Sequence, residues 1–122
     1  VRVATQEEAL RVHEAIMSLA AKHPLAKVTV TGGIMRPPME RTEEIGRLYA
    51  LARDIARDEL GFALPEASTG GVSDGNFTAA LGIPTLDGLG ARGDYAHSPK
   101  EYVTLDEVPR RTALLARLIE RC

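Results

Sequence analysis

The sequence predicts an α/β fold, because segments with the two-residue period of a strand alternate along the chain with segments that have the period of a helix. The strand-like segments are residues 1–3, 26–34 and 62–68, and the second of these alternates valine with threonine. The chain has 122 residues, of which 44% are hydrophobic, and this is sufficient for one modest globular domain.

Helices are predicted from capping signals followed by apolar residues at helical spacing. Thr5 stands three residues before Glu8, and Thr104 stands three residues before Glu107, so both pairs match a capping box. Thr42 is a further candidate N-cap. The predicted helices are 6–22, 43–60 with Gly61 as a left-handed stop, 76–81, and a terminal helix that begins near Pro109.

Paired prolines interrupt this pattern. Pro37 and Pro38 favour neither a helix nor a central strand, so we place a boundary at about residue 36. The preceding portion is short for an independent domain, because ~35 residues bury too little apolar surface to offset their ordering entropy. We therefore expect it to belong to a larger body. The start at Val1, without an initiator methionine, also suggests a fragment.

Composition excludes several classes of function. The net charge is −2 with interspersed signs, so the chain has no broad basic field for nucleic acid. It has no apolar run of the length that a membrane span requires and no basic-then-apolar leader, so we expect no membrane partner and a cytoplasmic protein. The single cysteine, Cys122, permits no internal disulfide.

One histidine lies in a glycine-rich loop, in the stretch GARGDYAHSPKEYV. A loop of this kind is a common place for binding chemistry. His97 is a candidate metal ligand, general base or surface histidine, and its spacing from the nearby acidic residues does not decide between these roles.

The stretch GGVSDGNFTAALG is a second candidate site. Its small residues lie between a predicted strand and a helix, where backbone N–H groups can face an anion, although a plain tight turn explains the pattern equally well. Gly71 to Gly75 also matches the letters of a GxSxG elbow, which would place Ser73 in a triad with Asp74 and His97. The preceding segment is weak as a strand and rich in turn formers, which disfavours a serine hydrolase.

Three separated segments, GGIMRPPMERT, GGVSDGNFTAALGIPTLDGLG and AHSPKEYV, together resemble the C-terminal part of the co-catalytic zinc peptidases. This family includes glutamate carboxypeptidase, acetylornithine deacetylase and succinyl-diaminopimelate desuccinylase, and the SDGNFTAALGIPTLDGLG run looks closest to the first. The resemblance implies that residues 1–35 are the end of a ferredoxin-like β-α-β lid that often forms a homodimer contact. Residues 36–122 would be the C-terminal part of the zinc-binding α/β domain.

The same resemblance assigns roles to individual residues. His97 would bind one of two zinc ions, Arg36 would grip the substrate's terminal carboxylate, and Gly71 and Ser73 would line the same pocket. The family's other zinc ligands, its bridging aspartate and its general-base glutamate lie in a more N-terminal region, so no catalytic residue is expected here. The stretch Gly93 to Tyr95 departs from the smaller glycine-rich run of many relatives.

The expected function is therefore that of one part of a zinc-dependent peptidase or amidohydrolase acting on a small peptide or an N-acyl amino acid. The fragment alone is expected to be inactive, because it offers one plausible zinc ligand. The alternative is a non-catalytic binding or dimerisation segment of a protein that has lost its metals.

Overall fold

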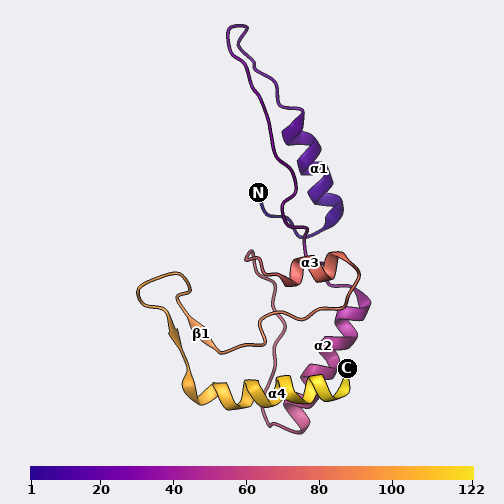
Figure 1. Ribbon diagram of the computed structural model, residues 1–122, viewed down its shortest axis with the longest axis vertical. Helices are drawn as coiled ribbons and strands as arrows, with labels where there is room; N and C mark the ends of the chain where they lie inside the picture. Colours follow the sequence, from indigo (N-terminus) through magenta and orange to yellow (C-terminus); the bar gives the residue numbers. More distant parts are fainter. The chain divides into compact units, whose positions relative to one another are not determined.

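The computed structural model describes residues 1–122, and the chain forms two compact units (Figure 1). The first unit contains residues 1–41 and 69–85, and the second contains residues 42–68 and 86–122. Four α-helices, one short 3₁₀ helix and a two-stranded sheet account for the regular structure. None of the helices is long and apolar enough to cross a membrane.

In the first unit, α1 spans Gln6–Met17 and begins at the predicted cap. The N–H of Glu8 donates to Thr5 Oγ1 at 3.2 Å, whereas the Glu8 carboxylate pairs with Arg11 instead of completing a capping box. The helix ends before the predicted residue 22. Its following apolar residue Leu19 is 59% exposed, so no packing energy supports a further turn.

The predicted strands at 1–3, 26–34 and 62–68 are wrong, because none of these segments pairs with another strand. Residues 26–34 are extended and run back from the tip of the first unit in the direction opposite to α1 (Figure 1). Alternation identifies side chains that one face could bury, but a strand also needs a partner for its backbone hydrogen bonds. These segments have no such partner in the chain.

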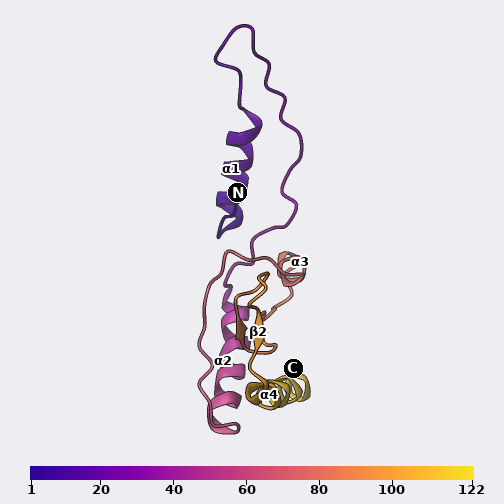
Figure 2. The ribbon, with the colours of Figure 1, turned by 90° about the vertical axis from the view of Figure 1, so that its left-hand side faces the viewer.

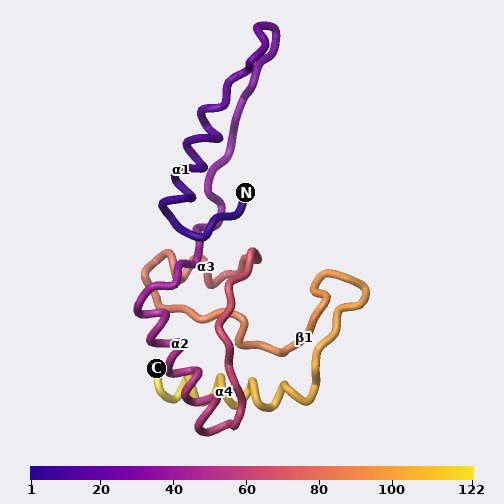
Figure 3. The backbone as a smooth tube through the Cα atoms, turned by 180° about the vertical axis from the view of Figure 1, so that it is seen from behind, coloured from indigo at the N-terminus to yellow at the C-terminus, as the bar shows by residue number.

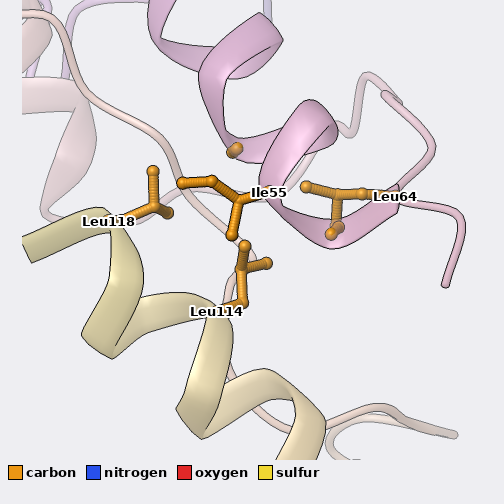
Figure 4. Close-up of a cluster of buried hydrophobic side chains, with 6 residues drawn as sticks. Ile55, Leu64, Leu114 and Leu118 are labelled. Atoms are coloured by element: carbon orange, nitrogen blue, oxygen red, sulfur yellow. The ribbon is translucent and has the colours of Figure 1, made fainter. Parts of the chain in front are cut away.

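The second unit is built on α2, Glu43–Asp58, and α4, Val108–Arg121, which cross one another (Figures 1 and 2). Ile55 of α2 points toward Leu114 and Leu118 of α4, with Leu64 beside it (Figure 4). This burial confirms the predicted apolar face of α2 and, at Leu114 and Leu118, that of α4, whereas Ile119 of the expected α4 face is 71% exposed. The remaining members of the core are Ala52 and Ala56, with Tyr49, Leu51, Leu60, Phe62, Leu86 and Leu89 packed around it.

The end of α2 follows the sequence prediction. Gly61 has a φ of 68°, a left-handed conformation that glycine adopts without strain. The chain then turns back along α2 (Figure 3), and the Tyr49 hydroxyl donates to the carbonyl of Leu64 at 2.8 Å. This bond holds residues 62–68 against the core although they form no strand.

The start of α4 differs from the prediction. A 3₁₀ turn, η1, Leu105–Glu107, precedes the helix, and the N–H of Glu107 donates to the backbone carbonyl of Thr104 at 3.2 Å. The Thr104 side chain therefore makes no cap, and the predicted second capping box is wrong. Pro109 lies in the first turn of α4, where a backbone N–H has no acceptor within the helix, so proline costs no hydrogen bond there.

Candidate functional site

His97 lies in the loop of a short hairpin in the second unit. Strand β1, Gly93–Asp94, pairs antiparallel with β2, Tyr102–Val103 (Figure 2). The Asp94 carboxylate accepts the N–H of Tyr95 at 2.7 Å, and the Glu101 carboxylate accepts the N–H of His97 at 3.2 Å. These two bonds tie the backbone of the loop to a carboxylate at each end of it.

The His97 side chain is available to a ligand. The residue is exposed, and its imidazole makes no hydrogen bond, so both ring nitrogens are free. No group of three or more His, Cys, Asp or Glu side chains comes together anywhere in residues 1–122. A zinc site needs about four ligands, and residues 1–122 bring no such group together.

Arg36 lies in the first unit between two residues of the glycine-rich stretch. Its Nη1 lies 3.4 Å from Asp74 Oδ1, and its guanidinium carbon lies 5.1 Å from the centroid of the Phe77 ring. Its side chain is 39% exposed. The guanidinium is thus oriented by a carboxylate and by an aromatic face while most of its five N–H donors remain open.

The turn before α3, Gly75–Ala80, is folded on its own hydrogen bonds. The N–H of Gly71 donates to Thr69 Oγ1 at 3.2 Å, that of Ser73 to Asn76 Oδ1 at 3.0 Å, and that of Gly75 to Ser73 Oγ at 3.1 Å. These three N–H groups therefore do not face an anion, which favours the tight turn over the N–H cradle. The Ser73 hydroxyl accepts one bond and keeps its own hydrogen to donate.

The serine-triad interpretation finds no support in this local structure. No strand precedes Ser73, and the helix that follows has only six residues, whereas a nucleophile elbow joins a strand to a long helix. Asp74 lies against Arg36.

Asn76 joins the Arg36 segment to the Ser73 turn. Its Nδ2 donates to the carbonyl of Pro37 at 2.9 Å, while its Oδ1 accepts from Ser73. Sequence reasoning did not identify Asn76, Asp74 or Phe77 as partners of this segment. The residues that meet are about forty positions apart, and no local periodicity signals such a contact.

The structure thus links the Ser73 turn through Asn76 to Pro37, the residue that directly follows Arg36. Gly71 lies in the same turn but has no bond to Arg36. His97 belongs to the other unit.

Residues 5–121 match the sequence profile of peptidase family M20/M25/M40. The chain belongs to this peptidase family. The resemblance predicted from its three motifs is therefore confirmed at the level of the family. No solved structure matches this chain.

The sequence of this M20/M25/M40 family member is similar to those of several named enzymes. Over 94 residues it is 37% identical to carboxypeptidase G2 of Pseudomonas sp. (strain RS-16), an alignment that covers 76% of this chain and 22% of that protein. Over 76 residues it is 34% identical to succinyl-diaminopimelate desuccinylase of Stenotrophomonas maltophilia (strain K279a), covering 62% and 20%. The desuccinylase of strain R551-3 is 36% identical over the same length. The chain spans about a fifth of the length of these curated relatives.

Proposed function

We propose that this chain is part of a zinc-dependent metallopeptidase or amidohydrolase that cleaves the amide bond of a C-terminal or N-acylated amino acid. The observation that carries the proposal is the family match over residues 5–121, together with relatives named as a carboxypeptidase and a desuccinylase. The specificity proposed is that of a glutamate carboxypeptidase, with a small peptide or N-acyl amino acid as substrate.

Arg36 would bind the substrate's carboxylate. A planar guanidinium offers two parallel N–H groups to a carboxylate, and the Asp74 contact at 3.4 Å uses only one nitrogen. An exposed ion pair of this kind is weak, so Asp74 orients the guanidinium without closing it to a ligand. The Ser73 hydroxyl would donate a further hydrogen bond, and Gly71 would shape the adjoining turn.

His97 would hold one of two zinc ions, with the remaining ligands supplied from outside this chain. When bound, zinc supplies a hydroxide near neutral pH and polarises the scissile carbonyl. Residues 1–35 would be the end of a lid through which two subunits associate as a homodimer, and residues 36–122 would be part of the zinc-binding domain.

Substitution of Arg36 by lysine in the full-length protein tests this assignment. Lysine keeps the charge but loses the bidentate geometry, so kcat/KM on N-acyl-glutamate should fall by a factor that corresponds to about 1–3 kcal/mol. Arg11→Lys is the matched control, because Arg11 also pairs with a surface carboxylate, Glu8, but touches none of the proposed site residues. Unchanged kinetics of Arg36→Lys on carboxylate-bearing substrates would remove Arg36 from the site.

A further inference from the structure

A buried asparagine supports the arginine of the proposed carboxylate site. Asn76 is 9% exposed and is the only buried polar residue of the chain. Burial of a side-chain amide is unfavourable unless its donors and acceptor find partners. Both ends of this amide have one, since Oδ1 accepts from Ser73 and Nδ2 donates to the carbonyl of Pro37. A single side chain therefore connects the turn to the residue that directly follows Arg36.

The residues on either side of Asn76 contact Arg36 itself. Asp74 lies two positions before it and pairs with the guanidinium, and Phe77 follows it and lies under the guanidinium. These two contacts are at the protein surface, where ion pairs and cation–π contacts are individually weak. The part-buried bond from Asn76 to Pro37 is the contact that does not depend on an exposed side chain.

Anchoring at Pro37 also restricts the preceding residue. The proline ring fixes φ of Pro37, and the clash of its Cδ limits the backbone of Arg36 to extended conformations. With the Pro37 carbonyl held by Asn76, the Cα of Arg36 and the direction of its side chain are set relative to the Ser73 turn.

We propose that Asn76 is a positioning residue of the carboxylate site, which holds Arg36 in the orientation that binds the substrate carboxylate. This inference rests on the proposed function of Arg36. Because Asn76 is buried, we expect it to act through Arg36 and not on the substrate directly. If the bond from Asn76 to Pro37 is lost, the Arg36 guanidinium can adopt more orientations, and it must give these up when a carboxylate binds. The affinity for the substrate therefore falls, while the rate of the chemical step is unchanged.

The test compares two substrates of the full-length protein, an N-acyl amino acid and the same compound with its carboxylate converted to a carboxamide. Asn76→Asp has nearly the same shape and keeps the acceptor for Ser73, but it loses the N–H that reaches Pro37. Its KM for the carboxylate substrate should rise about fivefold to tenfold with kcat nearly unchanged, as expected for one lost hydrogen bond. Activity on the carboxamide should stay as in the unmodified protein.

Two further variants complete the comparison. Asn76→Ser carries no charge and is too short to reach both partners, so it should behave as Asn76→Asp does and stands in for it if the aspartate variant does not fold. Thr78→Val is the matched control in the same helix, because it removes the hydrogen bonds to Gly75 and Thr85 but none to Arg36 or Pro37. The control should leave the ratio of the two substrates unchanged.

The outcomes separate the inference from the proposed function. If Arg36→Ala retains the preference for the carboxylate substrate, the proposed role of Arg36 fails, and the inference fails with it. If Arg36→Ala abolishes the preference but the Asn76 variants preserve it, only the inference is overturned. An equal loss on both substrates in the Asn76 variants would show a general structural role and would likewise overturn it.

Discussion

His97 and Tyr95 are the two non-glycine residues with positive φ, at 67° and 59°. The left-handed conformation is unfavourable for most side chains by roughly 1–2 kcal/mol, and histidine is among the residues that adopt it most often. The N–H groups of Tyr95 and His97 donate to the carboxylates of Asp94 and Glu101, and these hydrogen bonds offset this strain. The backbone that carries the His97 imidazole is therefore hydrogen-bonded within the hairpin, which is the kind of support that the proposed zinc-binding role would need.

Gly93 supports the same loop through the absence of a side chain. A Cβ at Gly93 would meet the carbonyl oxygen of Tyr102 on the paired strand, and a backbone atom cannot move aside cheaply. Gly93→Ala should therefore open the hairpin, with a local loss of about 1–3 kcal/mol. Hydrogen exchange at the Thr104 amide, which donates to Arg92 at 2.8 Å, reports this opening.

Gly90→Ala is the control for this substitution, because no atom lies within 4 Å of a Cβ built there. It should leave the protection of the Thr104 amide unchanged. Equal protection in the Gly93 and Gly90 variants would contradict the close approach of the two strands.

At the scale of elements, the packing of α2 on α4 depends on a few buried side chains. Ile55 is 1% exposed, so Ile55→Val should lower the free energy of unfolding by about 0.5–1.5 kcal/mol. The same substitution at Ile119, which is 71% exposed, should change it by less than about 0.5 kcal/mol. Urea unfolding followed by circular dichroism measures both, and similar losses at the two positions would show that this core is placed wrongly.

Acidic residues on α1 and α2 make the stability of these helices depend on pH. A hydrogen bond from Arg57 lowers the pKa of Asp58, a bond from Arg11 lowers the pKa of Glu8, and backbone and Thr42 hydrogen bonds lower the pKa of Glu44. A carboxyl with a lowered pKa binds fewer protons in the folded chain, so its stabilisation is present above the ordinary pKa and is lost as pH falls through the lowered value.

We therefore expect the thermal midpoint to be level near pH 6–7 and to fall below about pH 4, where these carboxylates become protonated. Asp58→Asn should flatten part of that fall, because it removes one of the groups that titrate. A midpoint that rises on acidification would contradict the direction of the three shifts.

At the scale of the whole molecule, the chain buries little for its size. Eight hydrophobic residues are buried, whereas nineteen large hydrophobic residues are exposed. The chain also spans about a fifth of its curated relatives. Both observations are what the proposed function leads us to expect of this chain.

The chain alone should therefore hold zinc weakly and hydrolyse no peptide or acyl-amino-acid bond, since His97 offers one ligand where about four are needed. In the full-length protein, His97→Ala should weaken one of the two metals and reduce activity by orders of magnitude. His23→Ala is the control, since the His23 ring nitrogen accepts a local N–H from Leu25. Measurements of metal content by atomic emission and of the rate of N-acyl-glutamate hydrolysis test both predictions. Stoichiometric zinc in the chain alone, or full activity of the His97→Ala protein, would refute the assignment.

The sequence by itself determined where α1 and α2 begin, where α2 ends, and the family. Capping by Thr5 and Thr42 and the stop at Gly61 act within a few residues, so local patterns reveal them. The family motifs are also read directly from consecutive letters, and residues 5–121 match the profile.

Only the tertiary structure decided which extended segments pair and which side chains surround Arg36. A strand requires a second strand for its backbone hydrogen bonds, and the alternation in residues 26–34 does not indicate whether one is present. The contacts of Arg36 with Asp74 and Phe77, and the bond from Asn76 to Pro37, join residues about forty positions apart. Such contacts depend on how the chain returns upon itself, and no local propensity encodes that path.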